Sequence, residues 1–525
     1  MLLSDRPIST PAEDQLGFQP FCATLAKGLR EMAPAEGMVV ALHAPWGSGK
    51  TSALNLLQHH LAVLDVAELS KKNPEDVAAL AAARADAADE AERKQAGDWI
   101  KLHEKHRKNL KTTVIRFNPW YFSGQESLFK AFFGVLGTEL SVTNNTKVAK
   151  AVAAVLKRGD AAGAMLGAAV GLGTVGPMAA AGGATIGGFF GKLVGDKFEQ
   201  KESLEASLQQ LREALQTSER RLLIVVDDID RLLPEELRQI LTLIKSLGNL
   251  PNITYLLAFA RAEVVDLIKR AGISNADYLE KIVQVSFELP RVDRYALRTM
   301  LFARLDATRK SKELKETTRW SRAFFDHIDP YLRTPRDVTR LCNSLQVTWP
   351  AVEDEVDWTD LVVLEVLRLH EPDIYDLVLA KLDRLTGETS SFGDDKEWAK
   401  DLVPTADNSS EPEQVKKALM SLFPRLAKAW EPNSFSYGKD NQAQRNRRLQ
   451  CPEYASNYFS LSPASDQFTA AQIKNLFTAV DSREAFDKLF EAAKARKTRR
   501  GSTMVCRLLL QIKEEIKDPS RKGTQ

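Results

Sequence analysis

Lysine and threonine follow a glycine-rich turn in a pattern that suits the binding of phosphate groups. The segment reads APWGSGKT over residues 44–51, behind an apolar run and ahead of a helical pattern. In such a loop, backbone N–H groups and the start of the next helix cradle phosphates. We expect Lys50 to reach the β- and γ-phosphates of a nucleoside triphosphate and to assist catalysis, and the Thr51 hydroxyl to ligate Mg²⁺.

The predicted binding residues are the loop itself and the first helical turn behind it. They are Pro45, Trp46, Gly47, Ser48, Gly49, Lys50, Thr51 and Ser52. The usual pattern, G-x-x-x-x-G-K-[ST], begins with glycine, and Ala44 takes that place here. Because alanine adds a single methyl group, the change is mild unless the backbone at Ala44 needs a positive φ angle.

A second segment, RLLIVVDDIDRLL at residues 221–233, supplies acids for the same chemistry. Five consecutive apolar residues, 222–226, predict a parallel strand that is buried on both faces. Open α/β sheets bind their ligands at the carboxyl ends of such strands. Asp227 is therefore the predicted Mg²⁺ ligand beside the threonine, and Asp228 is the predicted catalytic residue that polarises the attacking water. Asp230 begins the next turn.

Two arginines are candidate sensors of the γ-phosphate. An apolar strand at residues 253–260 ends in Arg261, which is either a sensor or a surface residue that starts the next helix. Arg336 lies in TPRDV at residues 334–338, where proline suits the first turn of a helix. Arg336 either closes over the nucleotide or forms a structural salt bridge, and the sequence leaves both pairs of alternatives open.

Taken in order, these segments resemble the KAP family of P-loop NTPases. DDIDR at 227–231 and YLEKIVQ at 278–284 are the most specific matches, and RFNPW at 116–120 fits as well. One departure is Ala260, which stands where the family often has aspartate. The resemblance covers most of residues 5–461 and implies an ATPase or ATP-operated switch. It also implies insertions that often include a membrane hairpin, and several bacterial members are associated with excluding phage.

Length and composition set the outer limits of the fold. We expect an α/β P-loop NTPase core, a parallel sheet flanked by helices, over residues 1–290, followed by a mainly helical domain over 291–525. The 72 basic and 70 acidic residues nearly balance, so nucleic acid is not indicated as a partner. The four cysteines lack metal-ligand spacing, and the start of the chain lacks a secretory signal. We therefore expect a cytoplasmic location.

The core is predicted to be interrupted twice. The first insertion, about residues 62–111, is rich in alanine and charged residues and predicts a helical arm. This arm is either a solvated helical pair or a docking element for a partner. The second insertion, about residues 145–200, is a Gly/Ala-rich hairpin with no charged residue over the 31 positions 161–191.

Glycines in the second insertion recur every four residues. The two series are Gly163, Gly167 and Gly171, then Gly183, Gly187, Gly191 and Gly195. Such a stripe lets another backbone approach closely. A membrane span needs about 20 residues and each half of the hairpin offers about 15. Three interpretations stay open for residues 163–195: a membrane-active hairpin, a soluble hairpin or oligomer contact, and a flexible linker.

Three functions fit these features. The first is an ATP-hydrolysing switch, with ATP and Mg²⁺ as cofactors, that changes the helical domain and acts in anti-phage defence. The second is a membrane-acting effector controlled by nucleotide, which is consistent with a membrane-associated location. The third is a nucleotide-binding scaffold that recruits a separate effector enzyme. Arginine fingers often act across subunits, so a homo-oligomer, a separate effector protein or both are expected as partners.

Overall fold

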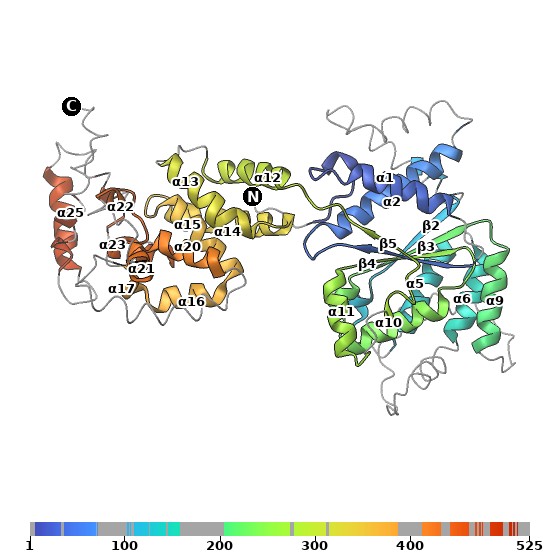
Figure 1. Ribbon diagram of the computed structural model, residues 1–525. Helices are drawn as coiled ribbons and strands as arrows, with labels where there is room; N and C mark the ends of the chain where they lie inside the picture. The colour runs from blue at the N-terminus through green and yellow to red at the C-terminus, as the bar shows by residue number, and fades with distance from the viewer. Residues whose placement is uncertain are drawn as a thin grey trace. The chain divides into compact units, whose positions relative to one another are not determined.

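The computed structural model divides into two compact units, Arg6–Val292 and Asp293–Gln525. It describes residues 6–32, 36–69, 110–124, 127–142, 145–157, 204–273, 278–310, 316–386, 412–431, 441–460 and 483–496, with a few short pieces between and after them (Figure 1).

The first unit is built on a sheet whose five described strands all pair in parallel. The strands are β1 (Met38–His43), β2 (Thr112–Phe117), β3 (Arg221–Asp227), β4 (Ile253–Phe259) and β5 (Val285–Glu288). Their order across the sheet is β2-β3-β4-β1-β5. β3 and β4 are internal and buried along nearly their whole length, which is why the sequence reads there as continuous apolar runs. The register places the carboxyl ends of β1, β3 and β4 side by side.

Helices cover both faces of this sheet (Figure 1). One face carries α1 (Gln19–Glu31) and α2 (Lys50–Leu69). The other carries α5 (Leu128–Val142), α6 (Thr146–Lys157), α9 (Leu204–Gln216), α10 (Pro234–Leu247) and α11 (Arg261–Arg270). Strand side chains alternate between the two layers, with Val40 and Leu42 packed toward the first pair of helices and Val39 and Ala41 toward the second group. The predicted α/β fold class is confirmed.

Parts of both predicted insertions belong to the core of the unit. α2 continues to Leu69, because Val63 and Val66 pack there with Leu102 and Leu110. α6 is a core helix, since Val148, Val152 and Val155 recur at helical spacing and are buried. The sequence placed both stretches in insertions because neither contains a break that separates it from the residues that follow.

The glycine stripes at residues 163–195 lie outside the described residues, as does most of the predicted helical arm. The three interpretations of residues 163–195 therefore stay predictions. Among the helices that the structure does describe, none is both long enough and apolar enough to cross a membrane.

The second unit consists mainly of helices in its described residues. Its longer helices are α12 (Arg294–Thr308), α14 (Pro335–Val352), α15 (Trp358–His370), α20 (Pro412–Leu422) and α25 (Arg483–Ala495). The shorter ones are α13 (Thr317–Ala323), α16 (Pro372–Ala380), α17 (Leu382–Leu385), α21 (Pro424–Trp430), α22 (Asn441–Arg445) and α23 (Pro452–Ala455). α14 packs against α12 and α15, and α15 also packs against α20. α15 is buried from Trp358 to Leu367, so it forms the centre of this bundle.

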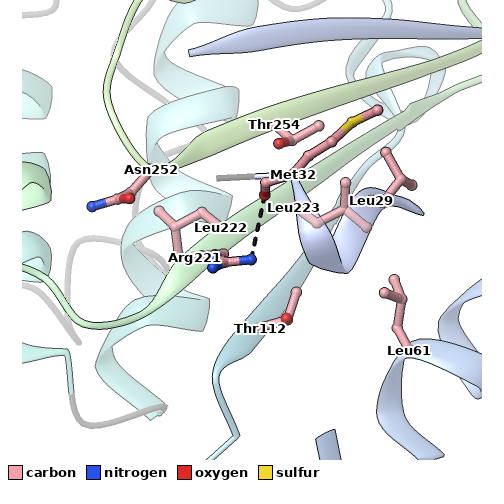
Figure 2. A pocket seen from close by; sticks show the side chains of 9 residues that line it. All are labelled: Leu29, Met32, Leu61, Thr112, Arg221, Leu222, Leu223, Asn252 and Thr254. Carbon is pink, nitrogen blue, oxygen red and sulfur yellow. Dashed lines mark hydrogen bonds between the residues drawn. The ribbon is translucent and has the colours of Figure 1, made fainter. Parts of the chain in front are cut away.

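A small pocket lies at the amino-terminal end of the strands (Figure 2). Its lining residues are Leu29, Met32, Leu61, Thr112, Arg221, Leu222, Leu223, Asn252 and Thr254. Nη1 of Arg221 donates to the carbonyl oxygen of Met32 at 3.3 Å and ties the end of α1 to the start of β3. This pocket is at the opposite end of the sheet from the acids that follow β3, and the candidate site is at the carboxyl ends.

Candidate nucleotide-binding site

The loop between β1 and α2 has the backbone conformation that phosphate binding needs. Gly47 and Gly49 have φ angles of +80° and +100°, which glycine adopts without steric cost. Ala44 is buried and is not among the described residues with positive φ, and its N–H donates to the carbonyl oxygen of Phe259 at 3.2 Å. The alanine that replaces the usual glycine is therefore compatible with the loop.

Contacts inside the loop fix its shape. Ser48 folds back on Pro45, to whose carbonyl oxygen its hydroxyl donates at 2.6 Å. A Cβ atom on Gly49 would lie 3.0 Å from Cε2 of Phe18, so the loop packs directly on that buried ring. Trp46 is 53% exposed. A side chain at Gly49 would be strained by the positive φ angle and would crowd Phe18, which is consistent with a loop that offers its backbone to a ligand.

The two predicted Mg²⁺ ligands lie next to each other. The Thr51 hydroxyl donates to Oδ2 of Asp227 at 3.0 Å, and Oδ1 of Asp227 accepts the N–H of Asp228 at 2.9 Å. Burial, and then the charge of Asp228, raise the pKa of Asp227 above its ordinary value. A hydroxyl and a carboxylate are hard oxygen donors, which Mg²⁺ prefers when substrate phosphates complete its ligands. These residues fit the ion.

Asp228 is held by partners on both of its oxygens. Nδ2 of Asn118 donates to Oδ2 at 2.9 Å, and Nε of Arg231 lies 3.0 Å from Oδ1. The Arg231 guanidinium stacks on the ring of Trp120, 5.2 Å from its centroid. Asp228 itself has a φ angle of +59°, which turns its side chain out of the line of β3. A strained residue held in this way is common at functional sites.

Lys50 forms a buried ion pair with Asp230. Its Nζ is 3.2 Å from Oδ2 of Asp230 and 3.3 Å from the carbonyl oxygen of Ala44. The two side chains are only 7% and 3% exposed. Oδ2 of Asp230 also accepts the N–H of Ala260, the last residue before α11, at 2.9 Å. The third acid of the DDIDR segment thus connects the loop lysine to the end of β4.

Ser52 and the two candidate sensor arginines have separate environments. Oγ of Ser52 accepts the N–H of Ile8 at 3.3 Å, so the segment before α1 lies against the first turn of α2. Arg261 is exposed at the start of α11, and its charge contributes, after burial, to a lowered pKa of His43 at the end of β1. Arg336 follows Thr334 and Pro335 at the start of α14, in the second unit. The carboxyl ends of β1, β3 and β4 lie side by side, so the residues that follow these strands share one edge of the sheet. They are Lys50, Thr51, Asp227, Asp228 and Arg261.

A family model matches the chain over residues 18–352, and its description is "KAP family P-loop domain". The chain belongs to the KAP family. The predicted resemblance is confirmed over more than half of the sequence.

One curated protein that is similar to this chain is named "Phage T7 exclusion protein" and comes from Escherichia coli (strain K12). It is 24% identical over 393 residues, which are 71% of this chain and 47% of the relative. The chain therefore spans about half the length of that relative.

Three solved structures share a weak likeness with this chain. The ORC2 protein of Aeropyrum pernix in ADPNP–ADP complexes has a TM-score of 0.30 at 10% identity, over 67% of this chain and 65% of its own. Cdc6p of Pyrobaculum aerophilum has a TM-score of 0.30 at 14% identity, over 80% and 88%. The Aeropyrum pernix ORC1 protein in complex with DNA has a TM-score of 0.26 at 13% identity, over 81% and 96%. Because these TM-scores are low, the fold of the chain is described from its own parallel sheet and not from these structures.

For two residues of the candidate nucleotide-binding site, the sequence predicted no chemical role. Asn118 contacts Asp228, and Asp230 pairs with Lys50. Both belong to segments that carry the family resemblance, RFNPW and DDIDR. The pairing itself depends on strand order, because β2 lies beside β3 only in the folded sheet.

Proposed function

We propose that the chain binds ATP with Mg²⁺, hydrolyses the γ-phosphate bond, and uses the cycle as a conformational switch in excluding phage. The observation that carries this proposal is the 3.0 Å contact between Thr51 and Asp227, directly beside Lys50 and Asp228. Membership of a P-loop NTPase family supports nucleotide hydrolysis in general. The relative named as a phage exclusion protein supports the biological role.

Each residue has a distinct task in this proposal. N–H groups of the loop between Ala44 and Lys50 face the phosphates, and the start of α2 adds the positive end of its dipole. Lys50 neutralises charge on the β- and γ-phosphates. Thr51 and Asp227 would hold Mg²⁺, which would neutralise negative charge that develops on the phosphates.

Asp228 orients the attacking water. Its carboxylate accepts hydrogen bonds from Asn118 and lies against Arg231, which keeps it next to Asp227 rather than free in solvent. A carboxylate that accepts a hydrogen bond from water places the water oxygen for in-line attack. Each carboxylate oxygen can accept a second hydrogen bond, so Asp228 can bind the water while Asn118 and Arg231 stay in place.

The proposal also includes a partner protein that responds to the nucleotide state of the chain. A second copy of the chain or a separate effector protein reads the nucleotide state, since P-loop enzymes commonly complete their sites across subunits. Arg261 and Arg336 are the proposed sensors of the γ-phosphate within the chain.

Replacement of Asp228 by asparagine tests the catalytic assignment. Asparagine keeps the shape and tolerates a positive φ angle, so the fold and the loop should persist. We expect ATP turnover to fall by about 100-fold or more, the usual contribution of a positioned base, while ATP affinity changes little. Asp266→Asn, on the exposed face of α11, is the matched control. Unchanged turnover in Asp228→Asn would contradict the assignment.

A further inference from the structure

The ion pair between Lys50 and Asp230 stands apart from the other acids of the site. Asp227 faces Thr51, and Asp228 faces Asn118 and Arg231. Oδ2 of Asp230 takes both the ammonium of Lys50 and the N–H of Ala260. Its other oxygen, Oδ1, is buried and makes no hydrogen bond within the described residues. Asp230 is therefore a buried anion whose only described cationic partner is the loop lysine.

Burial makes this pairing mutually dependent. An ammonium and a carboxylate that are 7% and 3% exposed have both lost most of their water. Each needs the other, because a buried charge without a partner is strongly destabilising. Asp230 thus supplies the negative charge beside Lys50, whose ammonium also donates to the carbonyl oxygen of Ala44.

Phosphates compete for the same lysine. A nucleoside triphosphate brings several negative charges to the ammonium that Asp230 already neutralises. Two anions that share one cation at close range repel each other, and the repulsion is strong where water is excluded. Binding of phosphate therefore weakens the hold of Asp230 on Lys50 and also disturbs Ala260, which precedes Arg261 at the start of α11.

We propose that Asp230 is a positioning residue that pairs with Lys50 and competes with nucleotide phosphates for it. The inference rests on the proposed function, because it takes the triphosphate as the ligand. Asp230 stabilises the loop lysine and lowers the affinity for nucleotide, and its release from Lys50 transmits phosphate binding to the end of β4.

Asp230→Asn separates charge from shape. The amide oxygen still accepts the N–H of Ala260, while the charge that competes for Lys50 is gone. We expect the full-length variant to bind a non-hydrolysable ATP analogue with Mg²⁺ on the order of tenfold tighter than the unaltered protein, since net hydrogen bonds to charged groups are of that size. Calorimetric titration measures this without turnover, and Asp266→Asn is the control with an exposed acid removed.

Melting temperatures of the empty protein give a second readout. Asp230→Asn and Lys50→Met should each lower the melting temperature, because each leaves one buried charge unpaired. The double variant should melt above Lys50→Met, since it leaves no unpaired charge. The ATP analogue should raise the melting temperature of Asp230→Asn by more than that of the unaltered protein.

The outcomes separate this inference from the function on which it rests. Nucleotide binding by the unaltered protein with equal or weaker binding by Asp230→Asn would overturn the competition and leave the proposed function standing. Absence of nucleotide binding in the unaltered protein would overturn the function itself. If Asp230→Asn does not fold, the double variant, which leaves no unpaired charge, is compared with Lys50→Met. Tighter binding of the analogue by the double variant supports repulsion between Asp230 and the phosphates, and equal or weaker binding contradicts the inference.

Discussion

At the scale of single residues, the site is a cluster of acids around one lysine and one threonine. Burial raises the pKa of Asp227, and the neighbouring Asp228 raises it further. The ionised carboxylate is therefore less favourable in the folded protein than in the unfolded chain. Stability linked to this carboxyl is greatest below its unfolded pKa and is lost as the pH rises through its folded pKa. The proposed role of Asp227 as a metal ligand therefore comes at a cost in stability.

Asp227→Asn should consequently stabilise the protein in the absence of nucleotide. The amide can accept the N–H of Asp228, while the Thr51 hydroxyl accepts from its NH₂ group. Near neutral pH we expect the melting temperature to rise, because the amide has no charge whose burial must be compensated. The difference should shrink as the pH falls toward about 4. Scans across this range, with and without Mg²⁺–ATP, measure both effects.

The same variant should lose most of the stabilisation that Mg²⁺–ATP gives to the unaltered protein, because one metal ligand is gone. A variant that melts lower than the unaltered protein at neutral pH without nucleotide would contradict this account of Asp227.

Residue types predicted the centre of the site but not its outer contacts. Lys50, Thr51 and Asp227 follow from local patterns, since each lies at a fixed place in a short motif. The pairing of Asp230 with Lys50 does not follow, because it joins residues 180 positions apart. Asn118 reaches Asp228 only because β2 pairs with β3 in the folded sheet.

At the scale of elements, the loop between β1 and α2 is shaped by glycine and by Phe18. Gly49 combines a φ angle of +100° with a contact that a Cβ atom would tighten to 3.0 Å. Gly28, in the middle of α1, has neither a positive φ nor a neighbour within 4 Å of such an atom. The two glycines lie in the same unit and differ in backbone conformation and in the space around a Cβ atom.

Alanine at these two positions should act in opposite directions. Gly49→Ala should lower the free energy of unfolding by about 1–3 kcal/mol through backbone strain and should weaken ATP binding. Gly28→Ala should raise the free energy of unfolding by about 0.4–1 kcal/mol, because alanine loses less entropy in a helix. Urea titration of both variants gives the comparison. Destabilisation by Gly28→Ala equal to that by Gly49→Ala would refute the explanation.

Helices and strands could be predicted from the sequence where burial gives them a clear pattern of apolar residues. The apolar run at 222–226 is internal strand β3, and TPRDV begins α14 with Thr334 as its N-cap and Pro335 in the first turn. The limits of the insertions were not predictable in this way. α6 reads as an alanine-rich helix, and only its packing on α5 and α9 shows that it belongs to the core.

At the scale of the whole molecule, the chain consists of an α/β unit that carries the candidate site and a helical unit that begins with α12. A switch requires that nucleotide bound to the first unit changes the second. Arg336, in the first turn of α14, is the proposed carrier of this coupling. The sequence predicted a helical region after about residue 290 because the spacing of its apolar residues changes to that of helices.

Hydrogen exchange can measure this coupling directly. Addition of a non-hydrolysable ATP analogue should slow amide exchange in the first turns of α12 and α14, as well as in the loop at residues 44–51. Arg336→Ala should keep the protection of the loop and lose that of α14. Arg340→Ala, one turn further along the same helix, is the matched control. Equal protection of α14 in Arg336→Ala and the unaltered protein would contradict the proposed role of Arg336.

The measurement that tests the central claim most directly is Mg²⁺-dependent phosphate release from ATP by the purified chain, beside Lys50→Ala. The account predicts turnover by the unaltered protein and its loss in Lys50→Ala, with circular dichroism showing that both are folded. Turnover that persists in folded Lys50→Ala, or a folded unaltered protein that neither binds nor hydrolyses ATP, would contradict the assignment of this site.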